Sequence, residues 1–141
     1  MIVCRAILFF GLLVSGVAVA DESREVLAVA LGEIEAFGGP ITTIVLSPGL
    51  PQTLRQSAAQ LRATVEQSNL TPALDEQLPN TYFRLGSIDI KDDVATVSGD
   101  IGAVLRPDPE NMFGCGVGYT VKLGQNADGA WIPNDIFSIT C

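Results

Sequence analysis

The side chains that could perform acid–base chemistry or hold a cation are a group of aspartates. Asp89, Asp92, Asp93 and Asp100 lie close together in the sequence. Their spacing does not match the D-x-[DN]-x-[DN]-G loop of a calcium site, and aspartate is common in hairpin turns because its carboxylate bonds the local backbone. We interpret these aspartates as solvated turn residues, with a weak cation site or a carboxylate acid–base pair as the alternatives. No metal ion or other cofactor is predicted.

Three aromatic side chains carry polar groups that could contact a ligand. Tyr82 and Tyr119 have hydroxyls, and Trp131 has an indole N–H that can donate a hydrogen bond. The first expectation for Trp131 is packing in the core. The alternative is that all three line a pocket between helices and sheet, so they are the candidate ligand-binding residues.

Glycines alternate along one predicted strand. Gly114, Gly116 and Gly118 therefore share one face and leave a strip of bare backbone. Such a strip indicates strong curvature of the sheet, which we favour, or the close approach of another chain, a helix or a ligand. It precedes a strand pattern rather than a helix, so it is not a phosphate-binding loop.

Residues 1–20 have the pattern of a secretory signal peptide. Arg5 supplies the positive charge, residues 6–14 form an apolar segment, and Ala18-Val19-Ala20 is a small-residue cleavage site. Cleavage after Ala20 would leave one domain, residues 21–141, in the periplasm or outside the cell and without membrane contact. An uncleaved leader that anchors the chain is the alternative.

The predicted export affects the expected state of the three cysteines, because exported proteins form disulfides. Cys4 leaves with the leader, and Cys115 and Cys141 remain in an oxidising compartment, which predicts a disulfide between them. A reactive thiol or an intermolecular bridge is the alternative. A final hairpin centred near Asn126 places Cys115 opposite residue 137 or 138, and a bulge at Pro133-Asn134 would shift that pairing.

Charge and composition exclude several classes of function. The 141 residues contain no histidine, which excludes Ser-His-Asp and Cys-His catalysis and His-ligated metals. The net charge is −8, and loss of Arg5 leaves 7 basic against 16 acidic residues, or −9. Nucleic acids and anionic lipid surfaces attract basic proteins, so neither is an expected partner. The expected partner is an unknown small molecule or protein.

Hydrophobic periodicity predicts helices first and strands later. Helical spacing covers residues 22–37 and 52–68, with a short turn over 71–79 and an edge strand or extended connector over 41–46. After residue 80 the period changes to two, over 81–90, 94–105, 113–123 and 130–140. The predicted fold class is α+β, with two amino-terminal helices packed on a curved four-stranded antiparallel meander.

This order of elements resembles the cystatin-like and NTF2-like folds, in which a curved sheet wraps a helix. The segment Gly118 to Leu123, followed by Asp128-Gly129-Ala130-Trp131, is similar to the strand–turn–strand ending of many small exported domains of that kind. Enzymes of the NTF2-like group place aspartate with histidine or tyrosine inside the cone. With no histidine and no aspartate assigned to an inner face, no catalytic residue is carried over.

Three functions remain open at this point. The first is a non-catalytic exported domain that binds a small molecule or a protein. The second is a small NTF2-like enzyme that uses carboxylates or tyrosines in the cone. The third is a pilin-like surface subunit, because the leading apolar segment, the four-stranded sheet and a carboxyl-terminal disulfide resemble type IV pilins. The processing motif of pilins, in which a glutamate soon after the cleavage point lies in a long apolar helix, is absent.

Overall fold

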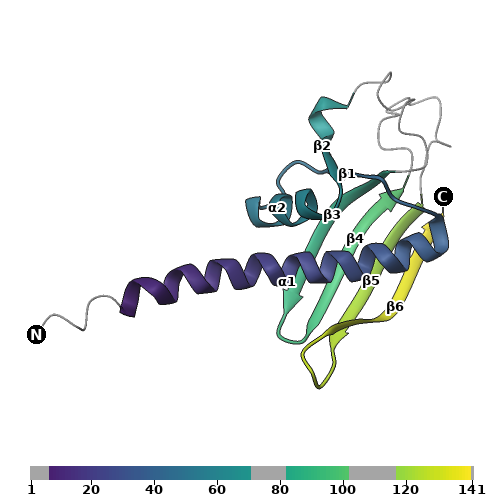
Figure 1. Cartoon of the computed structure of the whole chain (residues 1–141). Helices are drawn as coiled ribbons and strands as arrows, with labels where there is room; N and C mark the ends of the chain where they lie inside the picture. Colours follow the sequence, from purple (N-terminus) through teal and green to yellow (C-terminus); the bar gives the residue numbers. More distant parts are fainter. Residues whose placement is uncertain (1–6, 71–81, 102–116, 141) are drawn as a thin grey trace, which may run out of the picture.

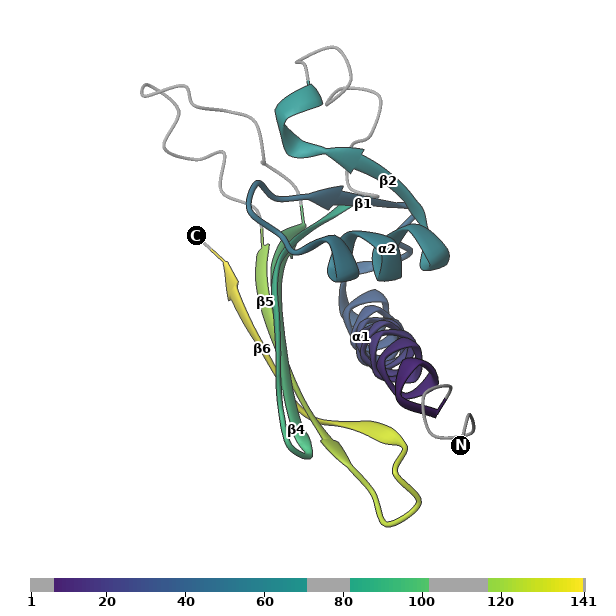
Figure 2. The ribbon, with the colours of Figure 1, turned by 90° about the vertical axis from the view of Figure 1, so that its left-hand side faces the viewer.

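The computed structural model describes residues 7–70, 82–101 and 117–140 (Figure 1). Within these ranges the chain forms two α-helices and one six-stranded sheet, which confirms the α+β class. Both helices cover the same face of the sheet (Figure 2). We call this the inner face, and the opposite face of the sheet the outer face.

Helix α1, Ile7–Gly38, includes the predicted helix 22–37 and begins earlier. Its second half crosses the sheet, and its first half extends beyond the sheet edge (Figure 1). A stripe at helical spacing faces the core, namely Val26, Leu27, Ala30, Leu31 and Ile34. Gly39, with φ of +88°, ends the helix and donates its N–H to the Glu35 carbonyl. No helix in the described ranges is long and apolar enough to cross a membrane.

The sheet has six strands where four were predicted, in the order β2-β1-β3-β4-β5-β6. Strands β3, β4, β5 and β6 pair antiparallel with their neighbours in sequence, and β1 pairs parallel with both β2 and β3. The bounds are β1 Thr43–Leu46, β2 Ala63–Glu66, β3 Tyr82–Lys91, β4 Val94–Ile101, β5 Val117–Gln125 and β6 Trp131–Thr140. The segment 41–46 thus contains an internal strand rather than an edge strand.

Helix α2, Gln52–Leu61, is shorter than the predicted helix 52–68. Arg62 is extended, and its guanidinium donates to the Ile41 carbonyl and the Glu35 carboxylate, both at 3.0 Å. The residues that follow pair with β1 as β2, and then form a short 3-10 helix, η1, Gln67–Asn69. Pairing with a strand distant in sequence therefore replaces the last turns of the predicted helix.

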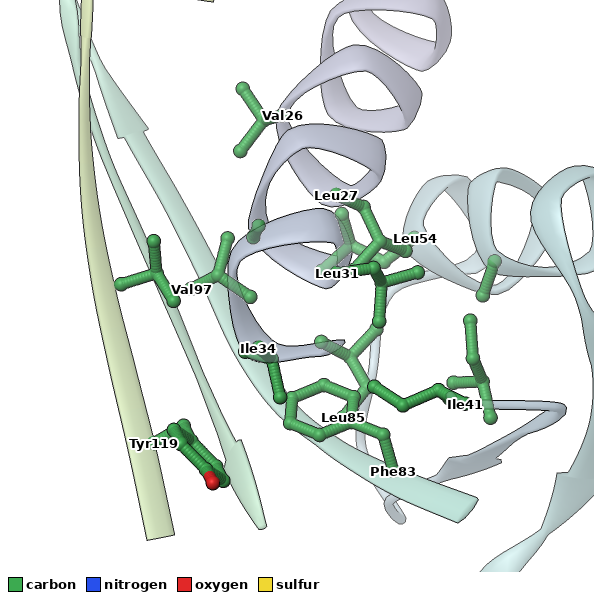
Figure 3. Close-up of a cluster of buried hydrophobic side chains, with 14 of the residues drawn as sticks. Val26, Leu27, Leu31, Ile34, Ile41, Leu54, Phe83, Leu85, Val97 and Tyr119 are labelled. Atoms are coloured by element: carbon green, nitrogen blue, oxygen red, sulfur yellow. The ribbon is translucent and has the colours of Figure 1, made fainter. Parts of the chain in front are cut away.

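The main core lies between the helices and the inner face (Figure 3). Phe83, Leu85 and Val97 of the sheet are fully buried and belong to the same cluster as the α1 stripe. The Phe83 ring lies against bare backbone at Gly99, where an added Cβ would lie 2.3 Å from its Cζ atom. The described inner face is thus filled by packed side chains.

The two hairpins differ in how well their registers were predicted. Asp92, with φ of 58°, and Asp93 form the tight turn expected between β3 and β4. The last hairpin turns later than expected, because Gln125 pairs with Trp131. The expected bulge is confirmed, since Asn134 has no partner between the pairs of Pro133 and Asp135.

Candidate interaction site

The three predicted ligand-binding residues lie apart in the structure. Tyr82 is buried in a small second cluster with Val45 and Leu70. Tyr119 and Trp131 belong to the main core, at opposite ends of the β5–β6 hairpin. The Tyr119 hydroxyl faces the end of α1, 3.1 Å from the position that a Cβ at Gly38 would occupy. No described cavity brings these side chains together, and their ligand role stays a prediction.

The predicted disulfide and most of the glycine strip lie outside the described residues. This applies to Cys115, Cys141, Gly114 and Gly116. Gly118 is described, and a Cβ there would meet only the Ile139 carbonyl oxygen, at 3.8 Å. No element of the described chain covers Gly118 closely, so with respect to those residues its backbone is uncovered on the outer face.

Three rows of side chains cross the outer face of β3 to β6. Alternation along each strand places these residues opposite the buried inner-face residues. The first row is Arg84, Asp100, Gly118 and Ile139. The second is Ser87, Ser98, Thr120 and Phe137, and the third is Asp89, Thr96, Lys122 and Asp135.

A shallow hollow of about 290 Å³ lies over the first two rows. Gly118 contributes bare backbone to its floor, and Phe137 and Ile139 line it from β6. These two side chains are 49% and 73% exposed, so they present apolar surface at the rim of the hollow. The full lining is Arg84, Gly86, Ser98, Gly99, Asp100, Gly118, Tyr119, Thr120, Phe137 and Ile139.

An ion pair borders the hollow on the β3–β4 side. Arg84 donates from Nε and Nη2 to the two carboxylate oxygens of Asp100, at 2.6 and 2.8 Å. The two residues are direct cross-strand neighbours. The strand register therefore places the guanidinium beside the carboxylate, where it can form two parallel hydrogen bonds. Both carboxylate oxygens of Asp100 thus accept hydrogen bonds from Arg84.

Two further charges on the outer face have no ion-pair partner among the described residues. Lys122 and Asp135 are paired in register, yet they do not form a salt bridge with each other. The Lys122 ammonium instead lies 5.5 Å from the centroid of the Phe137 ring. Asp135 accepts the N–H of Ile136.

The hairpin aspartates do not form a cation site. Within the described residues, no group of acidic or cysteine side chains could hold a metal ion. The buried polar residues in the same ranges are Ser23, Thr43 and Ser57, and none is a carboxylate. The described lining of the hollow offers bare backbone, apolar side chains, the hydroxyls of Ser98 and Thr120, and an ion pair.

The chain was compared with known proteins by family models, by curated sequences and by solved structures. None of the three comparisons found a match. Function must therefore be inferred from the geometry of the outer face.

Sequence reasoning singled out Gly118 but missed Phe137 and Ile139. Alternation in 130–140 places these two on one face, together with Trp131. The bulge at Asn134 reverses the alternation midway along β6, so Phe137 and Ile139 lie on the outer face while Trp131 lies on the inner face. The pairing of Arg84 with Asp100 also needed the register of β3 and β4, which the bulge beside Gly86 shifts.

Proposed function

We propose that the chain is an exported, non-catalytic interaction domain that binds a protein partner through the outer face of β3 to β6. The observation that carries the proposal is the open hollow over Gly118, bordered by exposed Phe137 and Ile139. Small-molecule pockets usually enclose most of the ligand and measure about 300–1,000 Å³. The hollow, about 290 Å³, is at the lower end of this range and is open rather than enclosing, which suits single side chains that project from a protein partner.

The enzyme alternative has less support. Catalysis in the cone requires a carboxylate buried near a tyrosine, because burial is what adapts such a group to acid–base work. Asp100, one of the four aspartates considered from the sequence, is paired with Arg84 on the outer face. The cystatin-like or NTF2-like architecture is kept here as an interpretation of α1 packed across antiparallel strands.

A pilin-like subunit is the second candidate, favoured by one observation. Helix α1 is continuous over 32 residues, and its first half extends beyond the sheet. An apolar helix of this kind could join subunits in an assembly. Removal of the leader, as the sequence predicts, would keep every residue of α1 that is described as buried, from Ser23 onward.

Site-specific photo-crosslinking in the exporting cell tests the proposed function. A photoreactive phenylalanine would replace Ser98, which lines the hollow, and Gln56, which is exposed on α2 as the control. We expect an adduct of discrete mass at Ser98 and none at Gln56. The adduct should disappear when Gly118→Val fills the hollow, while the exported amount stays constant.

Two results would contradict the proposed function. One is a Ser98 probe that gives no adduct although the chain is exported at the normal level. The other is an adduct that forms equally from Gln56 or that survives Gly118→Val. The mass of the adduct also identifies whether the partner is another protein or a second copy.

A further inference from the structure

We propose that the partner of the outer face is a second copy of this chain, placed on it by a two-fold axis. This inference rests on the proposed function and specifies its partner. A two-fold interface uses one surface patch twice, so residue i contacts residue j and j contacts i. The outer face must therefore be complementary to itself.

The register of β5 and β6 supplies this complementarity. Each of the three rows pairs a β5 residue with a β6 residue of complementary size or charge. Bare backbone at Gly118 is paired with Ile139, and Thr120 is paired with the larger Phe137. In the third row, Lys122 is paired with Asp135.

A two-fold axis parallel to the strands and midway between β5 and β6 would bring each β6 over the partner's β5. Ile139 of each copy would then enter the hollow over the other copy's Gly118, and Phe137 would lie over Thr120. Sheets pack face to face about 10 Å apart with their strands roughly aligned, which this axis allows. The Gly124 position is excluded from the contact, because the Asn134 amide already lies over it.

The same axis would bring Lys122 of one copy to Asp135 of the other, twice. Both charges are exposed and lack an ion-pair partner in the described chain, so neither salt bridge would replace an existing one. On the described strands β3 to β6 the outer face is neutral, because its three cations match its three anions, namely Arg84, Lys91, Lys122, Asp89, Asp100 and Asp135. These six residues therefore contribute nothing to the net charge of −8, so they add no net repulsion between two copies that meet through this face.

Pairing through the free edge of β6 is a less suitable mode of dimerisation. Pro133 has no N–H to donate, and the N–H of Ile136 is already bonded to the Asp135 carboxylate at 2.9 Å. Both features reduce the hydrogen-bonding capacity of an edge strand. The exposed apolar side chains also project from the face of the sheet rather than along its edge.

Charge reversal at the third row tests the dimer. Sedimentation of the purified exported chain, over micromolar to millimolar concentrations, should show reversible dimers. Lys122→Asp and Asp135→Lys should each raise the dissociation constant by about tenfold or more, because each places like charges in both symmetry-related contacts. The matched control is Lys91→Asp, which makes the same charge change on β3, away from the β5–β6 contact.

Mixing the two variants gives the decisive measurement. The Lys122→Asp variant has aspartate at both positions 122 and 135, and the Asp135→Lys variant has lysine at both. An equimolar mixture should therefore form heterodimers, while each variant alone is monomeric. Heterodimer formation also shows that both variants are folded.

The inference is overturned if the wild-type chain stays monomeric, if Lys122→Asp dimerises like wild type, or if the mixture stays monomeric. A Ser98 adduct with a different protein would retain the proposed function and refute the second copy. Absence of any Ser98 adduct from a chain that sediments as a monomer would refute both.

Discussion

Gly99 and Gly118 lie on opposite faces of the same sheet, and their surroundings give an added methyl group opposite consequences. At Gly99 a Cβ would lie 2.2 Å from the Arg84 carbonyl oxygen and 2.3 Å from the Phe83 ring. At Gly118 the nearest atom would be 3.8 Å away. Glycine is required by packing at the first position, whereas at the second it leaves the outer face open.

We therefore expect Gly99→Ala to destabilise the fold by about 1–3 kcal/mol, the usual cost of overpacking a core. Gly118→Ala should leave stability unchanged or raise it slightly, because alanine restricts the unfolded chain more than glycine does. Urea unfolding midpoints of both variants and the wild type provide the comparison. Equal midpoints for the two variants would show that Phe83 does not pack against Gly99 as described.

At the scale of elements, the sequence pattern predicted those helix ends and turns that depend on neighbouring residues. The residues Gly38, Gly39 and Pro40 predicted the carboxyl end of α1. The two aspartates Asp92 and Asp93 predicted the β3–β4 turn. The sequence did not predict the end of α2, because Leu61 and Val65 continue the helical spacing of apolar residues beyond it. What ends α2 is contact with distant residues, through Arg62 and through the pairing of β2 with β1.

The candidate site was harder to predict for the same reason. Its rows depend on cross-strand register, and bulges at β3 and β6 change which residues share a face. Gly118 could be picked out because alternating glycine is a local signal. The neighbours that make it a hollow, Ile139 and Phe137, become its neighbours only through the β5–β6 pairing.

Arg62 should matter more than its half-exposed position suggests. Its guanidinium joins the end of α1, the segment before β1 and the end of α2, through Glu35 and the Ile41 and Leu61 carbonyls. We expect Arg62→Ala to cost about 1–3 kcal/mol, since partners would be lost at three points. Arg62→Lys should rescue little, because an ammonium lacks the planar fork that reaches several acceptors at once. Thermal unfolding of both variants tests this, and full rescue by lysine would refute the geometric role.

The predicted disulfide would act on the last hairpin. The final described pair of that hairpin is Val117 with Thr140, and the two cysteines lie two residues before and one residue after these positions. Closing such a loop stabilises by about 3–4 kcal/mol in the chain-entropy model. Reductant should lower the unfolding midpoint of the exported chain and leave a Cys115→Ser/Cys141→Ser variant unaffected. A wild-type midpoint that does not respond to full reduction would contradict the bridge.

At the scale of the whole molecule, acidic residues are concentrated on α1, which carries five acids and one arginine over residues 21–38. Three of the four described arginine ion pairs, Arg24–Asp21, Arg55–Glu66 and Arg62–Glu35, involve the helices or β2, and the fourth, Arg84–Asp100, is on the outer face. The remaining excess of acids belongs to the rest of the chain. The described strands β3 to β6 thus have a neutral outer face on an acidic protein, which is the property that the proposed dimer uses.

The whole molecule also depends on where α1 begins after export. We expect the exported chain to start at Asp21, as measured by intact mass spectrometry. Cleavage there would make Asp21, Glu22 and Ser23 the first residues of the helix, and acidic and hydroxyl side chains stabilise helix amino termini. The described buried residues of α1 would all be retained, because they begin at Ser23. Leucine at both Ala18 and Ala20 should block processing and move the chain to the membrane fraction. If the wild-type chain itself kept residues 1–20, the acids would lie inside a longer helix, and the pilin-like reading would replace the interaction domain.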